Sequence, residues 1–469
     1  MRLLVPALAC LMLSCAKKPA PVSLQSPEDL VESQLNAVVR ELVPLVEAAA
    51  GASFDEVPFV RLGRRTDLER IVRSEAMSTF DLLYPDAPTW RRDQFLAGMH
   101  GEGIAGKYAL NERILLVSPE SMARLAGQLQ DDPLALDHVT RLVLAHELAH
   151  ALQDQRSGIA SRFDTAPHLD AFQALRGVTE GHANFVETRV AEALGLEHVE
   201  EVLNGSQGWD ADGPDNAYSF STWAAYGQGQ DFVRFHADQG GLPRTWEVLS
   251  TPPERSRTIF VPEEYGAERP VDAADFALLD EIEDSVREER WFITRAPLLE
   301  LDLRQRLFGV PAPELEQALA GVRDGAQREA SRTDRSVRSL WVHTEDVAAA
   351  EALLALHRDH ADLLAAELNP VSGSGVYQVQ SEADLGDDAI RVLSGPSLDG
   401  DAVVSVQRES HALWVRVGAD VVLVEAVGMR PGSALTTAAT ELVARVRARD
   451  AGAGQGGAGR LSPDDVTNP

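Results

Sequence analysis

Residues 142–155 of the chain read LVLAHELAHALQDQ, and the rest of the sequence is best interpreted outward from this stretch. Its helix-favouring residues predict a helix from about residue 133 to residue 155. His146 and His150 are four positions apart, so they lie on one face of that helix, one turn from each other. Their neighbours are mostly apolar. A buried helix places polar side chains in such surroundings only when those side chains have a partner.

The spacing of His146, Glu147 and His150 is typical of a catalytic zinc site. Two imidazoles one turn apart can bind the same ion, and Glu147 can reach a water on that ion without occupying a ligand position. Glu147 would then act as general base toward the water and as proton donor to the leaving amine. We therefore expect one Zn²⁺ ion as cofactor. The competing interpretation is an ordinary amphipathic helix whose histidines are satisfied within the core.

A catalytic zinc site with two histidines needs a third protein ligand, and the sequence offers Glu180 for this position. Glu180 follows the second histidine by thirty residues and lies on another predicted helix, residues 169–194. The competing interpretation is a plain carboxylate on a helix surface. The metzincin extension of the motif fails, because Gln153 and Arg156 stand where it requires glycine and a further ligand.

Other polar residues near these positions receive lesser roles. Asn184, one turn after the third ligand, and Asp154, one turn after the second histidine, are candidates for orienting ligands in the second shell. His182 points to another part of its helix and is interpreted as a bystander. Gly181 would permit close contact between two helices, because it has no side chain.

The segment from Leu144 to Gln155 resembles one found in a group of bacterial predicted metalloproteases of the gluzincin type. Members show His-Glu-x-x-His-Ala-Leu-Gln-Asp-Gln and then Glu-Gly-x-Ala, which Glu180 to Ala183 match here. The resemblance covers about residues 55–265 and implies a mainly helical metallopeptidase domain with a small antiparallel sheet. The later matching positions are Tyr226, Gly229, Phe232, Val233, Gly240, Gly241, Pro252 and Pro253.

The group that stabilises the oxyanion stays open in this comparison. The gluzincin-type relatives show a His-Pro-Glu-x-Tyr segment, and this chain has Val261 in place of the histidine. Tyr226 is the first candidate, because a phenol can donate a hydrogen bond to the developing charge; it could also simply pack at a helix start. Tyr265 and His236 are lesser candidates. The resemblance further implies that the predicted hairpin 106–117 binds the substrate backbone by strand addition.

The N-terminus predicts export and lipid anchoring. A short apolar stretch follows Arg2 and ends before Cys15, an arrangement typical of a bacterial lipoprotein signal over residues 1–15. Cleavage would leave Cys15 as the lipidated first residue, followed by residues 16–27 as a tether. An ordinary secretory signal is the alternative. We expect a protein anchored by lipid in the cell envelope, at the outer membrane on its periplasmic or surface side.

The order of predicted elements favours the α+β class with two folded parts. Helices dominate residues 28–332, which form the predicted zinc metallopeptidase-like domain and include interrupted helices at 275–330. Strand candidates then become frequent, so residues 338–449 are predicted to be a smaller α+β accessory domain. Residues 450–469 are rich in glycine and alanine in their first half and are predicted to be a flexible tail.

Composition and chemistry together limit the function classes. The chain has 469 residues and a formal net charge of −30, which argues against nucleic-acid binding because phosphates would be repelled. We expect a peptide or protein substrate, and membrane contact through the lipid anchor. Hydrolysis of peptide bonds is the leading hypothesis. One alternative is a zinc amidase acting on cell-wall material. The other is an envelope binding or scaffold lipoprotein, and the presence of Glu147 disfavours this second alternative.

Overall fold

The structure is a computed structural model, and part of the sequence-based prediction lies outside the residues it describes. The predicted signal peptide with Cys15, residues 16–21 of the predicted tether and residues 454–469 of the predicted tail are outside. The described residues are 22–84, 86–97, 104–129, 132–206, 208–210, 213–215, 219–267, 273–282, 291–298, 300–333, 335–367, 375–382, 384–396, 409–430 and 432–453.

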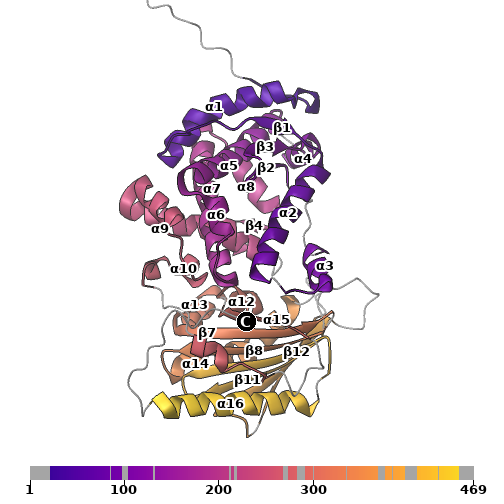
Figure 1. Cartoon of the computed structure of the whole chain (residues 1–469), viewed down its shortest axis with the longest axis vertical. Helices are drawn as coiled ribbons and strands as arrows, with labels where there is room; N and C mark the ends of the chain where they lie inside the picture. Colours follow the sequence, from indigo (N-terminus) through magenta and orange to yellow (C-terminus); the bar gives the residue numbers. More distant parts are fainter. Residues whose placement is uncertain are drawn as a thin grey trace, which may run out of the picture.

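The first part of the chain forms a mainly helical region, drawn in indigo to pink in Figure 1. One apolar core joins its long helices. In the described residues, no helix is long and apolar enough to cross a membrane. The elements are η1 (Pro27–Asp29), α1 (Glu32–Ala50), β1 (Val60–Leu62), α2 (Arg65–Leu83), α3 (Thr89–Ala97), β2 (Gly106–Ala109), β3 (Ile114–Val117), α4 (Pro119–Ala126), α5 (Ala135–Ser157), α6 (Ile159–Phe163), α7 (Leu169–Leu194), α8 (Glu197–Ser206), β4 (Trp209–Asp210), β5 (Gly213–Pro214), α9 (Phe220–Ser250), α10 (Arg257–Phe260) and η2 (Pro262–Glu264).

Helices α5 and α7 form the centre of this region, and both match the helices that the sequence predicted. Their apolar residues pack on both sides, so α5 is buried along most of its length. Each helix ends at a glycine in the left-handed conformation, Gly158 after α5 and Gly195 after α7, a conformation that glycine adopts without steric cost. Helix α9 packs against α7 and bends at Gly241, where φ is 69°.

A small sheet covers one side of α5 and has the strand order β1-β3-β2. The predicted hairpin is present, because β2 and β3 pair antiparallel with Tyr108 opposite Leu115. The first strand, β1, runs parallel to β3, with Val60 opposite Leu115. The sheet is therefore mixed rather than antiparallel, and β2 is its edge strand.

The second part of the chain is built on an antiparallel sheet, drawn in orange and yellow in Figure 1. Seven described strands form it in the order β6-β7-β8-β12-β11-β10-β9. Helix α16 packs on one face, and helices α12 to α15 cover the other. The elements are α11 (Ala273–Ala277), β6 (Phe292–Pro297), α12 (Glu300–Arg306), α13 (Ala312–Ala320), β7 (Val322–Arg332), β8 (Arg335–Thr344), α14 (Val347–Asp359), α15 (Ala361–Glu367), β9 (Gly375–Ser381), β10 (Asp388–Pro396), β11 (Ser410–Val417), β12 (Asp420–Val427) and α16 (Ser433–Ala453).

The α+β class is confirmed, and two segments differ from their sequence-based description. Strands β6 and β7 occupy part of the range 275–330, where interrupted helices were predicted, so the sheet begins at Phe292. Residues 22–27 were predicted as tether, yet Leu24 is fully buried and its backbone N–H donates to Asp137 at 3.1 Å. In both segments, contacts with residues distant in the chain decide the structure.

Candidate metal centre

Two helices bring the three predicted metal ligands together. His146 and His150 come from α5, and Glu180 comes from the facing part of α7. The Nε2 atoms of the two histidines lie 3.1 Å apart. Glu180 Oε2 lies 3.5 Å from Nε2 of His146 and 3.2 Å from Nε2 of His150. These three atoms form a compact triangle that could hold one metal ion.

The dimensions of this triangle match zinc. Bonds from zinc to nitrogen or carboxylate oxygen are about 2.0–2.2 Å, so neighbouring ligand atoms in a tetrahedral site lie about 3.3 Å apart. The observed separations, 3.1, 3.2 and 3.5 Å, are close to that value. Glu180 Oε2 is also buried without a hydrogen bond of normal geometry among the described residues. The donor set of two imidazoles and one carboxylate therefore fits a zinc ion.

Two neighbours fix the orientation of the imidazoles. Nδ1 of His146 lies 2.9 Å from a carboxylate oxygen of Glu187, and Nδ1 of His150 lies 2.9 Å from the amide oxygen of Gln153. Both oxygens can only accept, so both Nδ1 atoms donate. In a neutral imidazole, the lone pair is then on Nε2. The two Nε2 lone pairs face each other, which is favourable only with a cation between them.

The electrostatics of the cluster favour positive charge at the same point. Burial alone would lower the pKa of His146, but its interactions with the carboxylates of Glu180 and Glu187 outweigh that effect and raise the pKa to about 10. Burial would raise the pKa of Glu180, and the two histidines hold it well below its usual range. Without a metal, this position retains a proton; with a metal, the ion replaces it.

Glu147 lies beside the cluster, between α5 and the edge strand β2. It is 8% exposed, and one carboxylate oxygen accepts the backbone N–H of Tyr108. A side chain at Gly106 would collide with Val143 and touch Glu147, so the strand approaches the helix here because position 106 is glycine. Glu147, which the sequence predicted as general base, therefore lies against β2 at Gly106 and Tyr108.

Tyr226 reaches the cluster because α7 and α9 touch at glycines. A Cβ at Gly181 would lie 2.1 Å from the carbonyl carbon of Gly229, so the two backbones are in direct contact. The Tyr226 ring stacks on His146 with 5.8 Å between centroids. Burial and the charge of Glu180 raise the pKa of Tyr226 well above its usual range, so the phenol keeps its proton and can donate it in a hydrogen bond.

The remaining candidates lie in other surroundings. The Nδ1 atoms of the ligand histidines bond Glu187 and Gln153, not Asn184. Asp154 accepts the hydroxyl of Tyr108 at 3.2 Å. His182, interpreted as a bystander, is fully buried, and its Nδ1 lies 3.1 Å from the amide nitrogen of Gln153.

The two lesser candidates for the oxyanion pack against each other. The Tyr265 hydroxyl donates to the carbonyl of Thr251 at 2.6 Å, and His236 lies between Phe232 and Tyr265. Burial lowers the pKa of His236 to about 4. Among the described residues, the structure places Tyr226, and neither of these two, in ring contact with a ligand histidine.

Two residues of the site, Glu187 and Gln153, were not predicted from the sequence. Glu187 lies two turns after Glu180 on α7, so the helical repeat carries a signal for it. Gln153 bonds His150, donates to the carbonyl of Thr179 at 2.8 Å and lies next to His182. Its spacing from His150 is one helical turn and could have indicated it, whereas its bond to Thr179 depends on the facing helix.

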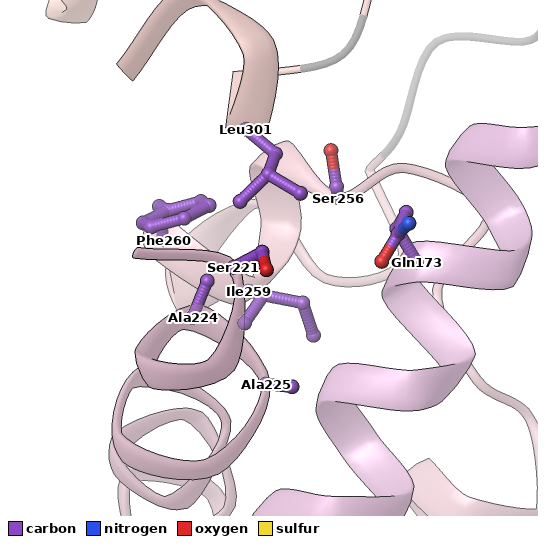
Figure 2. A pocket seen from close by; sticks show the side chains of 8 residues that line it. All are labelled: Gln173, Ser221, Ala224, Ala225, Ser256, Ile259, Phe260 and Leu301. Atoms are coloured by element: carbon purple, nitrogen blue, oxygen red, sulfur yellow. The ribbon is translucent and has the colours of Figure 1, made fainter. Parts of the chain in front are cut away.

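A small hollow elsewhere in the molecule does not carry this chemistry. Figure 2 shows it between α7, α9, α10 and α12, with apolar side chains on most of its wall. Gln173, Ser221 and Ser256 are the polar residues that line it. It contains none of the three candidate ligands.

Comparisons with known proteins include two distant structural similarities. No family model matches the chain, and no curated protein matches it significantly. The extracellular domain of PknH from Mycobacterium tuberculosis aligns at 15% identity over 39% of this chain and 99% of that one, with a TM-score of 0.27. A "putative hydrolase with a novel fold" from Chloroflexus aurantiacus aligns at 18% identity over 52% and 91%, with a TM-score of 0.38. At these values neither structure informs the function.

Proposed function

We propose that the protein is a zinc metallopeptidase that hydrolyses peptide bonds. One observation carries the proposal: His146, His150 and Glu180 form a triangle of zinc dimensions, and the carboxylate of Glu147 lies buried beside it. A purely structural metal site has no use for such a carboxylate. The donor set supports zinc over magnesium or calcium, since those ions prefer all-oxygen sites.

The residues of the site have separate tasks in this reaction. His146, His150 and Glu180 would hold the ion, while Glu187 and Gln153 orient the two imidazoles. A zinc ion in such a site lowers the pKa of a coordinated water to about 7 and polarises the substrate carbonyl. Glu147 takes a proton from the attacking water and delivers it to the leaving amine nitrogen.

The edge strand β2 gives the substrate a place to bind. Gly106 and Tyr108 direct their backbone groups away from β3, and Tyr108 N–H already holds Glu147. An extended peptide that pairs with this edge would bring its carbonyl past the carboxylate. The predicted lipoprotein signal with Cys15 supports placing this reaction at the cell envelope, with membrane contact through the lipid.

The replacement Glu147→Gln tests the general base. The variant should bind one zinc per chain and fold as the wild type does, while its rate of casein or peptide cleavage falls by about 10²–10⁴-fold or more. The exposed Glu112→Gln, in the turn between β2 and β3, is the control and should keep full activity. Unchanged activity in Glu147→Gln, or a zinc-loaded wild type that cleaves no peptide, would contradict the proposal.

The replacement Glu180→Ala tests the third ligand. Loss of one of three ligands should reduce the zinc content of purified protein well below one ion per chain, as metal analysis would measure. Full zinc retention would remove Glu180 from the ligand set. Cleavage of cell-wall fragments instead of peptides by the wild type would favour the amidase alternative, which uses the same ligands.

A further inference from the structure

Arg176 is a half-buried cation of the helical region that has no carboxylate partner among the described residues. Arg141 pairs with Asp137 at 2.7 Å, and Lys107 pairs with Glu75 at 3.3 Å. Arg176 is half-buried on α7 and makes no hydrogen bond or ion pair with the residues that the structure describes. Partial burial of a cation without a partner is costly, so such a residue is a candidate for binding an anion.

The helical repeat places Arg176 on the ligand-bearing face of α7. Glu180 is four positions later and Glu187 is eleven positions later, which corresponds to about one and three turns. Both glutamates contact His146. Because all three residues share one face, Arg176 is directed toward the same side of α7 as the zinc ligands, one turn before the third ligand.

The contact of α7 with α9 lies next to Arg176, because a Cβ at Gly229 would lie 2.2 Å from the carbonyl oxygen of Gly177. The direct contact of α7 and α9 at Gly181 and Gly229 brings Tyr226 onto His146. The pKa of Tyr226 is raised by burial and by Glu180, and the positive charge of Arg176 opposes this rise. Tyr226 is one turn before Gly229 on α9, and Arg176 directly precedes Gly177 on α7. Arg176 and Tyr226 therefore come from adjoining turns of two helices that are in direct contact beside the cluster.

We propose that Arg176 is a catalytic residue that binds the oxyanion of the tetrahedral intermediate together with Tyr226. This inference rests on the proposed function and supplies the role that Val261 leaves vacant. The water oxygen bonds to the carbonyl carbon while Glu147 takes the water proton, and the carbonyl electron pair moves to the oxygen. The C–N bond then breaks, the double bond re-forms, and the proton passes from Glu147 to the amine.

Arginine suits this task better than the paired Lys107. Its guanidinium stays charged, presents parallel N–H donors and loses little hydration when buried. A donor aimed at developing negative charge contributes most where water is excluded. The side chain of Arg176 has no described carboxylate to leave, so it is available for the oxyanion without breaking an ion pair.

The test measures inhibitor binding to zinc-loaded, full-length protein by calorimetry. N-phosphoryl-leucylalaninamide carries a tetrahedral anion and no C-terminal carboxylate, whereas mercaptoacetyl-leucylalaninamide binds metal through a thiolate only. Arg176→Gln should weaken binding of the phosphoryl compound by about 10- to 100-fold, keep the zinc content and leave binding of the thiol unchanged. Arg176→Lys should recover part of the loss. Arg189→Gln, at an exposed position of the same helix, should match the wild type in every measurement.

The outcomes separate this inference from the proposed function. Equal binding of the phosphoryl compound by wild type and Arg176→Gln would overturn the inference. An equal loss of affinity for both inhibitors in Arg176→Gln would also overturn it, and so would a wild type that does not bind the phosphoryl compound. A zinc-loaded wild type that cleaves no peptide would refute the proposed function, while the inhibitor measurements would still decide whether Arg176 binds a tetrahedral anion. Selective loss of the phosphoryl compound in Arg176→Gln supports the inference.

Discussion

At the scale of single residues, the site depends on side chains that do not touch the metal position. Gln153 is an example, because the oxygen and the nitrogen of its side-chain amide bond different partners. The oxygen accepts from His150, while the nitrogen donates to the carbonyl of Thr179 and lies 3.1 Å from His182. Burial lowers the pKa of His182 to about 3, so that ring stays neutral and accepts. This arrangement fixes which way the amide faces.

Replacing Gln153 with leucine should weaken zinc binding by about 10- to 100-fold, because His150 loses the acceptor that orients it. Competition with a chromogenic chelator measures this affinity. Gln155→Leu is the matched control, since that glutamine bonds residues 55–56 and no ligand. Equal zinc affinity in wild type and Gln153→Leu would show that the ring is held by other contacts.

At the scale of elements, the decisive feature is the close approach of α7 and α9. Gly177, Gly181 and Gly229 remove side chains from the contact, so the backbones meet directly. This approach gives Tyr226 its place on His146. A helix pair with larger residues would be separated further, since packed helices normally lie 8–10 Å apart.

Replacing Gly181 with alanine should force the two helices apart. The new Cβ would meet the Gly229 carbonyl carbon at 2.1 Å, and overpacking of this kind costs about 1–3 kcal/mol or more. Urea unfolding would measure the loss, and zinc affinity should fall with it. The control, Gly205→Ala, adds its Cβ where no atom lies within 4 Å and should not destabilise the protein.

A pH effect is expected at α8, where Glu200 accepts the hydroxyl of Thr188. Burial, together with Glu187 and Glu192, raises the pKa of Glu200 to about 7. The folded state therefore keeps a proton that the unfolded chain releases near its usual pKa of about 4.3, and stability falls as pH rises from there to about 7.

The variant Glu200→Gln should remove that loss. Its melting temperature should exceed that of the wild type by an amount that grows between pH 4.5 and pH 7 and is constant above. The exposed neighbour Glu201, changed to glutamine, is the control. A constant difference across this range would contradict the assignment.

At the scale of the whole molecule, buried ion pairs connect the helical region with the sheet below it in Figure 1. Arg255 lies 3.0 Å from Asp170 at the start of α7 and 3.4 Å from Asp324 in β7. Both carboxylates are almost fully buried. Burial raises the pKa of Asp170 to about 6 in spite of Arg255.

Removing the shared cation should therefore be strongly destabilising. Arg255→Met removes the cation that both buried carboxylates contact, and we expect a loss of about 3–5 kcal/mol in the free energy of unfolding, measured with urea. Adding Asp170→Asn and Asp324→Asn should restore much of it. Arg234→Met breaks an exposed pair with Asp231 and should cost less than about 1 kcal/mol. Equal stability of Arg255→Met and wild type would show that the regions are joined by other contacts.

The sequence by itself determined the central helices and the chemistry of the metal position. Helix α7 has the predicted bounds, and α5 differs from its prediction by two residues at each end. The helical repeat is local, so it places His146 and His150 on one face whatever the rest of the chain does. The identity of the metal and the reaction stay predictions.

The tertiary structure alone decided which distant side chains meet at this position. Glu187 reaches His146, and Gln153 reaches the Thr179 carbonyl, because α5 and α7 pack against each other. The role proposed for Arg176 depends in the same way on the contact of α7 and α9. The same reason explains the sheet. Strands β6 and β7 read locally as interrupted helix. Pairing holds them extended: β6 bonds β7, with Phe292 opposite Ser331, and β7 also bonds β8. Local periodicity selects helices, and long-range pairing selects strands and completes the site.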